Sequence, residues 1–436
     1  MTTAATVHAD SASTGQEMFE LVERLYPICR SLTGDGVRET LAILSEQVPL
    51  EVREVPTGAK VLDWSVPREW NIRDAWIDSP TGERVVDFRE CNLHVVGYSV
   101  PVRARLPLSE LRQHLHTLPE HPGWIPYRTS YWEEAWGFCL SQERLDSLEE
   151  GEYEVCIDSS LEDGHLCYGE LTIQGESDEE VLISTHVCHP SLANDNLSGI
   201  AVATFLAKRL AAAGPGRYSY RFLFVPGTIG PITWLALNED RKGRIRHGLV
   251  LALLGGPGPL TYKRSRRGDA EIDRVAAHVL GRAGGDVRDF DPYGYDERQY
   301  CSPGFDLPVG RLTRTPHGEF PEYHTSADDL ALVEGERLAD SLEKILEIAE
   351  ILDGNATYVN VNPRGEPQLG RRGLYRSLGG GTERRERELA LLWVLSFSDG
   401  AHTLLDISER SGLPFAAVRS AAHALIEHEL LARRPG

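Results

Sequence analysis

Apolar residues are most regularly spaced between about residues 150 and 355 of the chain. Four short runs there are mostly apolar, which is typical of strands buried on both faces of a sheet. Three longer stretches repeat apolar residues with a helical period. The runs cover 181–184, 220–225, 249–254 and 307–312, and the helical stretches cover 197–213, 272–283 and 334–352. Buried strands that alternate with helices predict an α/β fold with a mainly parallel sheet flanked by helices.

The chain before this stretch divides into a helical part and a β-rich part. In residues 1–51, apolar residues from Phe19 to Leu32 recur with the helical period, so we expect this part to add helices to the core. In residues 52–135, short alternating runs are separated by Pro and Gly, which is typical of short strands joined by turns. We therefore expect residues 52–135 to form a β-rich insert and residues 136–355 to form the α/β core.

The end of the chain has the spacing of a small helical domain. Residues 356–383 are polar and rich in Gly, which predicts a connector. Residues 384–436 hold three helical segments separated by short turns, and this spacing predicts a winged helix-turn-helix domain. The three segments cover 386–397, 404–410 and 414–427.

The charge of the chain argues against two classes of partner. The 436 residues carry a formal net charge of −21, whereas nucleic acids and anionic membranes bind basic surfaces. Residues 384–436 hold seven Arg, no Lys and seven Asp or Glu, and Arg419 is the one Lys or Arg in the expected recognition helix. We therefore expect no nucleic acid and no membrane as partners. The winged helix is assigned to protein contacts, and the chain is expected to be a homo-oligomer.

The N-terminal residues and the cysteines indicate a compartment. The first residues show neither the basic nor the apolar segment of a secretory signal, and no run of about 18 apolar residues predicts a membrane-spanning helix. The seven cysteines form no CxxC pair and no regular framework. Reduced thiols without an export signal lead us to expect a cytoplasmic protein.

The strongest candidate for chemistry is the segment VLISTHVCHPSLANDNLSG. An apolar strand leads into His186, and Asp195 comes just before the next helix. Ligands of α/β proteins bind at the carboxyl ends of strands, so a histidine and a carboxylate at this edge can converge on a metal. The alternative is structural, with Asp195 as a helix N-cap and His186 as a hydrogen-bonded loop residue.

Two further segments place charged or metal-ligating side chains in loops near strands. In PHGEFPEYHTSADD, His324 is a candidate ligand, and Glu322 would face the same way if this piece is extended. In DPYGYDERQYC, Asp296 and Glu297 are candidate carboxylates. Both segments have an alternative interpretation as solvated acidic loops.

Several long motifs run through the chain. In the core they are STHVCHPSLANDNLSG, PGTIG, GPLTYKRS, YGYDERQYCSPGF and PEYHTS. In the insert they are DWSVPREWNIRDAWI, NLHVVGYS and IPYRTSYWEEAWGFCLS. Together they resemble bacterial aminopeptidase-like proteins, which are similar to the zinc aminopeptidase and glutaminyl cyclase superfamily and carry a C-terminal winged helix. The resemblance spans about residues 16–436 and implies a zinc-aminopeptidase-like core.

The resemblance implies roles for single residues. His186 and His324 match metal ligands of this superfamily, and Asp195 matches the carboxylate that bridges two metals. Cys188 falls where related aminopeptidases have an Asp that contacts a ligand. Asp296 falls in the loop that supports the site. We therefore expect zinc, held by the two histidines and Asp195.

Two departures from the pattern change the expected site. Gly227 and Thr228, in FVPGTIG, fall where di-zinc aminopeptidases have two adjacent Glu, one a general base and the other a ligand. Residues 249–259 hold no acidic residue, although another Asp ligand is expected there. The remaining two histidines and one carboxylate are enough for one catalytic zinc, with water or substrate in the fourth position.

Hydrolysis also needs a group that accepts a proton from the attacking water. Glu322 is the first substitute for the missing base, and Asp296 and Glu297 are the second. We expect a zinc-dependent aminopeptidase-like amidohydrolase with a degenerate, mononuclear site and a small-molecule or peptide-like substrate. The alternatives are a non-hydrolytic acyl transferase or cyclase on the same scaffold and a catalytically inactive binding homologue.

Overall fold

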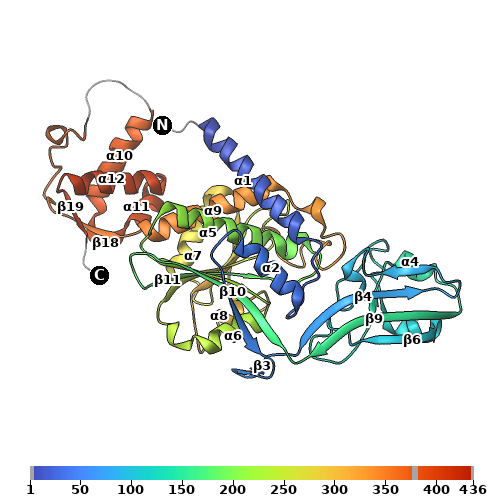
Figure 1. Cartoon of the computed structure of the whole chain (residues 1–436). Coiled ribbons are helices and arrows are strands. Elements are labelled where there is room, and N and C mark those ends of the chain that lie inside the picture. The colour runs from blue at the N-terminus through green and yellow to red at the C-terminus, as the bar shows by residue number, and fades with distance from the viewer. Residues whose placement is uncertain (1–3, 376–381, 434–436) are drawn as a thin grey trace. The chain divides into compact units, whose positions relative to one another are not determined.

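The computed structural model describes residues 4–375 and 382–433. The chain divides into two compact units, Met1–Ile345 and Leu346–Gly436. The first unit holds the α/β core and the insert, and the second holds the winged helix (Figure 1). Part of the expected connector, residues 376–381, lies outside the described residues. No helix in the described ranges combines the length and the apolar character that crossing a membrane requires.

The core of the first unit is a mostly parallel sheet. Within the described residues it has eight strands in the order β1-β10-β12-β11-β13-β16-β14-β15. The central strands β12, β11, β13 and β16 run parallel, and they are the four strands that the apolar runs predict. The bounds are β1 (Glu51–Pro56), β10 (His165–Ile173), β11 (Glu180–His186), β12 (Ser219–Val225), β13 (Ile245–Leu251), β14 (Thr261–Lys263), β15 (Asp286–Arg288) and β16 (Val309–Thr313).

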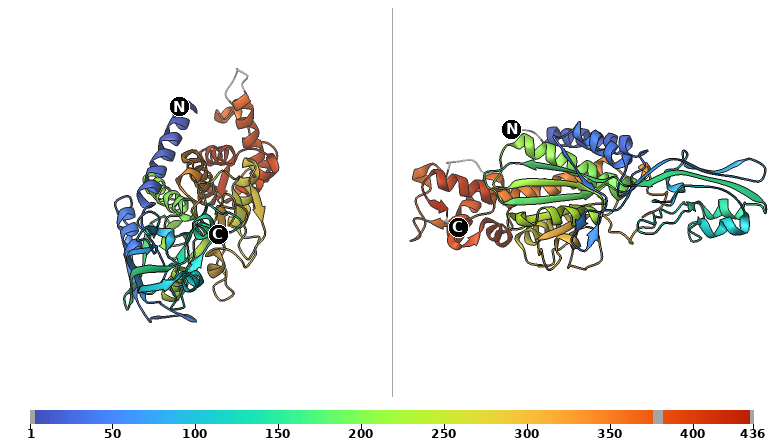
Figure 2. Two further views of the ribbon diagram at one scale, coloured as in Figure 1. Left: turned by 90° about the vertical axis from the view of Figure 1, so that its right-hand side faces the viewer. Right: turned by 60° about the horizontal axis from the view of Figure 1, so that its bottom comes forward.

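Helices cover both faces of this sheet, which explains why its central strands are buried along nearly their whole length. Figure 2 shows α1 and α5 on one face and α6 on the other. The three helices expected in the core are present as α5, α7 and α9. The helices are α1 (Ala4–Leu25), α2 (Asp35–Ser45), α5 (Gly199–Ala213), α6 (Ile229–Leu237), α7 (Glu271–Ala283), α8 (Glu297–Tyr300) and α9 (Gly335–Gly354).

The insert has its own antiparallel sheet in the order β5-β4-β9-β6. Its boundaries differ from the expected 52–135: β1 pairs with β10 in the main sheet, and β9 belongs to the insert. The reason is that β4 and β9 pair along almost their whole length, so the chain leaves along one and returns along the other. The elements are β4 (Glu69–Asp78), β5 (Arg84–Asp87), β6 (Val102–Pro107) and β9 (Glu152–Glu162), with short β2 (Lys60–Val61), β3 (Trp64–Ser65), β7 (Leu115–His116), β8 (Phe138–Cys139), α3 (Leu108–Leu111) and α4 (Gln142–Asp146).

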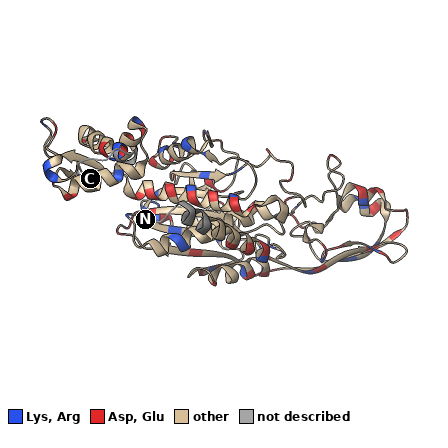
Figure 3. Cartoon of the chain, turned by 90° about the horizontal axis from the view of Figure 1, so that it is seen from above, with Lys and Arg blue, Asp and Glu red and all other residues tan. Residues whose placement is uncertain are grey.

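The second unit is a winged helix-turn-helix. Its helices α10 (Thr382–Phe397), α11 (Leu404–Ser411) and α12 (Phe415–Glu427) match the three expected segments. A three-stranded sheet joins β17 (Thr357–Asn360), β18 (Asp399–Thr403) and β19 (Leu431–Arg433). The unit therefore begins inside the expected connector, because β17 pairs with β18 and β19, which flank the helices. Figure 3 shows basic and acidic residues mixed in this unit.

Candidate functional site

The site begins at the carboxyl end of β11. This strand lies between β12 and β13 and ends at His186, where the apolar run predicts a strand end. His186 is buried, and its Nε2 lies 2.8 Å from Oδ1 of Asp195. Strand ends of this kind are where α/β proteins bind ligands.

Asp195 lies in a distorted segment, Ala193–Ser198, just before α5. The backbone dihedral angles of Asp195 and Asn196 are not helical, and the N-cap residue of α5 is Ser198. The carboxylate of Asp195 is fully buried and faces histidine side chains. The alternative interpretation of Asp195 as a helix N-cap is therefore wrong.

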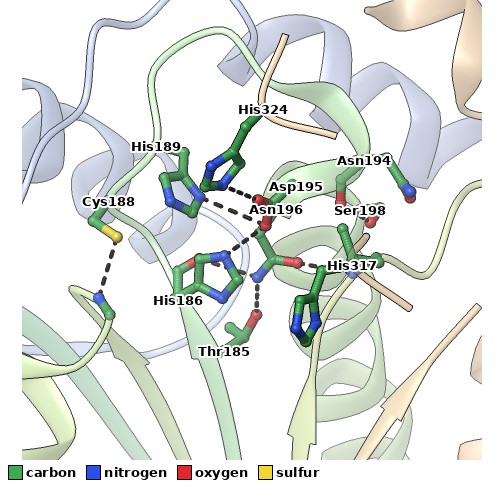
Figure 4. A network of polar contacts seen from close by, with 12 residues as sticks. Thr185, His186, Cys188, His189, Asn194, Asp195, Asn196, Ser198, His317 and His324 are labelled. Carbon is green, nitrogen blue, oxygen red and sulfur yellow. Dashed lines mark hydrogen bonds and ion pairs between the residues drawn. The ribbon is translucent and has the colours of Figure 1, made fainter. Parts of the chain in front are cut away.

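Three histidines surround this one carboxylate (Figure 4). Besides the contact with His186, Nε2 of His324 lies 2.9 Å from Asp195 Oδ2. Nδ1 of His189 lies 3.5 Å from Asp195 Oδ1. The structure thus brings together the three ligands that the sequence predicts, and it adds His189, which the sequence reasoning missed. The signal for His189 was a second histidine three positions after a predicted ligand at the same strand end.

The charge state of the cluster suits a cation. Burial by itself would raise the pKa of Asp195, but electrostatic attraction to His189 and the contacts with His186 and His324 hold that pKa well below its usual range. Burial lowers the pKa of His324. An ionised carboxylate and a neutral imidazole are the forms in which these side chains bind metals.

The donor set fits a zinc ion. One ligand atom from each of His186, His189 and Asp195 can be chosen so that all lie within 4.8 Å of one another. Nδ1 of His186 and Nδ1 of His189 are buried and have no hydrogen-bond partner within the described residues. Imidazole nitrogens and carboxylate oxygens are both common zinc ligands.

A buried network fixes the segment that carries Asp195. The two carboxylate oxygens of Asp328 accept the backbone N–H groups of Asn194 and Asp195, at 2.6 and 2.9 Å. The side-chain amide of Asn196 donates to the carbonyl of His186 at 3.1 Å, which ties this segment to β11. These bonds position the Asp195 backbone and leave its carboxylate to the histidines. Asp328 and Asn196 were not among the predicted site residues.

A cavity of about 210 Å³ opens beside the cluster. His186 and His189 line it, and Tyr295, which is stacked on His186 at 5.2 Å between ring centroids, is one of several aromatic residues in its wall. Trp132 also lines it, is 52% exposed and comes from the insert. The insert therefore contributes to the wall of the cavity.

Asp296 lines this cavity, whereas Glu297 does not. Asp296 Oδ1 accepts the backbone N–H of Thr228 at 2.7 Å, and burial raises the pKa of Asp296 to about 7. Glu297 is fully buried, and its Oε1 lies 2.6 Å from Nζ of Lys263. Because both carboxylates are buried, the interpretation of this loop as a solvated turn is wrong. The contacts of Glu297 are those of a residue that holds the loop.

Glu322 does not lie in the extended segment that its prediction as a catalytic base assumed. Residues 321–324 form a turn, and His324 has a positive φ of 57°. The expectation that Glu322 faces the same way as His324 required an extended chain, so that argument is wrong. Glu322 is partly exposed and does not line the cavity. Its role as a base stays a prediction.

Gly227 leaves room at the position of the missing base. It lines the cavity, and a Cβ atom added to it would lie 3.4 Å from Cys188 Sγ and 3.8 Å from His186 Cβ. These are ordinary van der Waals distances, so a side chain at this position can start toward the cluster without a clash. Residue 227 therefore lines the cavity with room for a side chain, although glycine has none.

Two family descriptions match the chain. Residues 19–355 match a family described as a domain of unknown function (DUF4910), which is more than half of the chain. The chain belongs to this family. Residues 356–433 match the winged helix-turn-helix, and this range includes β17.

Relatives from Clostridium acetobutylicum are similar to this family member over nearly its whole length. One protein, 52% identical over 424 residues and 97% of each chain, is provisionally described as a polysaccharide biosynthesis protein with an aminopeptidase-like domain. A crystal structure from the same organism, provisionally described as a peptidase, has a TM-score of 0.93 at 50% identity and 98% coverage of both chains.

A more distant structure shows the fold class. A zinc aminopeptidase from Bacillus subtilis has a TM-score of 0.57 at 12% identity, over 78% of this chain and 94% of that chain. The expected α/β core with a small antiparallel insert and a terminal winged helix is thereby confirmed. This family member is an aminopeptidase-like protein with a candidate metal group of histidines and Asp195.

Proposed function

We propose that this protein is a zinc-dependent amidohydrolase of the aminopeptidase type with one metal per chain. The observation that carries the proposal is the buried Asp195 carboxylate, which histidines surround at the end of β11. His186, Asp195 and His324 would hold the zinc ion, which when bound supplies a Lewis acid that polarises an amide carbonyl. The provisional descriptions of the two Clostridium proteins support the same activity class.

A count of donors supports one metal rather than two. Gly227 has no side chain, residues 249–259 hold no acid, and the neighbouring position is Thr228. In the described part of the chain, the backbone N–H of Leu253 donates to the side chain of Asn196 at 3.2 Å, so this strand end is tied to an amide and not to a carboxylate. A second divalent cation would lack both ligands and compensating charge.

Asp296 is the residue that we assign to accept a proton. It is the one carboxylate among the described residues that line the cavity. Its bond from the Thr228 N–H fixes the side chain, and its pKa of about 7 suits a general base at neutral pH. Glu322 is the alternative base, and it would have to reach the cavity from a partly exposed turn.

The cavity indicates a small or peptide-like substrate. Its volume of about 210 Å³ is below the roughly 300–1,000 Å³ of pockets for drug-sized ligands. It therefore suits one ring or one apolar side chain next to the amide. The description of the Clostridium relative also makes amides attached to sugars worth testing.

Acyl transfer to an amine is the second candidate, and Gly227 is the observation that favours it. An amine attacks a polarised carbonyl without the strong base that water requires, so loss of the usual glutamate harms transfer less than hydrolysis. Measuring products from an amide substrate with and without added amine separates the two reactions.

The test of the main proposal begins with elemental analysis of the purified protein. We expect one zinc per chain in the unmodified protein and a clear loss in His186→Ala. Two zinc ions per chain would show that the missing carboxylates are replaced from elsewhere. No zinc after dialysis against excess zinc would contradict the proposal and leave the non-catalytic binding homologue.

We also propose that the winged helix makes protein contacts, including those of a homo-oligomer. Arg419 is the one Lys or Arg of α12, and its guanidinium pairs with Glu350, so α12 offers little free positive charge to phosphates. Duplex DNA at physiological salt should bind more weakly than about 10 µM. A salt-sensitive submicromolar signal in fluorescence anisotropy would contradict this assignment.

A further inference from the structure

We propose that His189 is a fourth protein ligand of the same metal, beside His186, Asp195 and His324. This inference rests on the proposed function because it requires a metal at this cluster. The family resemblance gives His189 no role, and its place in the cluster follows from the tertiary structure alone.

The position of His189 meets the requirements for a ligand. Its Nδ1 lies 3.5 Å from Asp195 Oδ1, and its ring centroid lies 4.9 Å from that of His186 and 5.1 Å from that of His324. Its contact with Asp195 does not have the geometry of a hydrogen bond, and this buried Nδ1 has no hydrogen-bond partner in the part of the chain that the structure describes. A buried polar atom without a partner is unfavourable, and a bound cation would satisfy it.

The loop that carries His189 is held from outside the cluster. Arg30 is buried and donates from Nε to the carbonyl of His189 at 2.8 Å and from Nη2 to the carbonyl of Pro190 at 3.0 Å. The ring of Tyr127 packs edge-on against His189 and His324, at 5.3 and 5.0 Å between centroids. These contacts fix the backbone and restrict the ring, and preorganised donors of this kind favour metal binding.

Charge explains why a histidine suits this place. The cluster has one carboxylate, and neutral imidazoles add donors without adding charge. Three imidazoles and one carboxylate can fill the coordination positions of one divalent cation, whereas a single negative charge cannot compensate the charge of two such cations. His189 therefore replaces one of the two ligands that are absent from Thr228 and residues 249–259, and it does so without their negative charge.

His189 is also the ligand that the substrate would meet. It lines the cavity together with His186, whereas Asp195 and His324 do not. A zinc site with four protein ligands is closed unless it expands to five or loses one. Substrate or water would then enter beside His189 or in its place.

The experiment compares metal binding by the full-length protein and three single variants, His189→Ala, His324→Ala and His317→Ala. His317 is the matched control, because its ring lies near the site but its Nδ1 contacts Arg311 Nη1 at 3.4 Å. Each protein is titrated with Co²⁺ in the presence of a competing chelator, and the visible absorption of the bound ion is recorded. Circular dichroism checks that each variant is folded.

We expect His189→Ala and His324→Ala to weaken Co²⁺ binding by at least about tenfold and to change the absorption band. His317→Ala should match the unmodified protein. Unchanged affinity and spectrum in His189→Ala, with loss in His324→Ala, would overturn the role of His189 and leave the proposed function standing. No metal binding by the unmodified protein would overturn both.

A second measurement needs no variant. X-ray absorption of the zinc-loaded, unmodified protein counts the imidazoles around the metal. Three imidazoles support the inference, and two contradict it even if His189→Ala fails to fold.

Discussion

The loops that follow β11 and β12 leave the same edge of the sheet, yet they differ in what they offer. After β11, residues 187–198 supply His189 and Asp195. After β12, residues 226–228 supply backbone groups: the Gly227 N–H donates to Cys188 Sγ at 3.2 Å, and the Thr228 N–H donates to Asp296.

The difference shows that a loop needs two separate things to bind a metal: a strand order that brings it to the site, and side chains that can act as ligands. Adjacent parallel strands bring both loops to the site whatever their sequences are. Of these two loops, only the one after β11 supplies metal ligands in our proposal, and the loop after β12 holds Asp296 through a backbone bond. Single substitutions in and around the two loops test this division.

Asp195→Asn should abolish stoichiometric zinc binding, with a loss of affinity on the order of 100-fold or more. The amide keeps the shape of the side chain but removes the one charge of the cluster. Zinc content after dialysis is the measurement. Asp289→Asn is the control, because the Asp289 side chain is 98% exposed. Full zinc content in Asp195→Asn would show that the loop after β11 is not the metal-binding one.

Asp296→Asn should lower kcat by about 10²- to 10⁴-fold while zinc content is unchanged, because the amide cannot accept a proton. Glu322→Gln is the matched comparison and should have a small effect on both quantities. The opposite result, with turnover lost only in Glu322→Gln, would identify Glu322 and not Asp296 as the base. Loss of zinc in Glu322→Gln would instead make Glu322 a ligand.

Gly227→Glu should increase amide hydrolysis by at least about tenfold, since it returns a carboxylate to the wall of the cavity. The added Cβ has room beside Cys188 and His186. Gly227→Gln has nearly the same shape without the charge and should show no increase. Equal rates in both variants would mean that the loop after β12 no longer faces the reacting bond.

The stability of the metal-free protein should depend on pH through Asp296. Burial raises the pKa of Asp296 in the folded state to about 7, above the ordinary value of 3.8, so the folded protein binds this proton more tightly than the unfolded chain. This contribution is largest below about pH 4 and is lost as the pH rises through about 7. Urea unfolding at pH 5 and pH 8 should show a smaller difference in Asp296→Asn than in the unmodified protein. An identical difference would contradict a buried Asp296.

Local patterns were sufficient for the elements and for part of the site. Mostly apolar runs predicted β11, β12, β13 and β16, because a strand covered on both faces needs no polar side. Motifs pointed to His186, Asp195 and His324, although these residues are up to 138 positions apart. The insert boundary was misjudged, because the partner of β4 is β9, and pairing between distant strands leaves no local mark.

The sequence by itself determined which side chains exist: it excludes a carboxylate at Gly227 and in residues 249–259, and it provides Asp195, a few further carboxylates and several histidines near strand ends. Only the tertiary structure decided which of them meet. It placed His189 beside Asp195. It folded residues 321–324 into a turn, so Glu322 does not have to face the same way as His324. It also buried Glu297 against Lys263, whereas Asp296 lines the cavity. The physical reason is that a turn or a loop sets the direction of its side chains through backbone dihedral angles and contacts from distant strands, and residue order alone does not specify either.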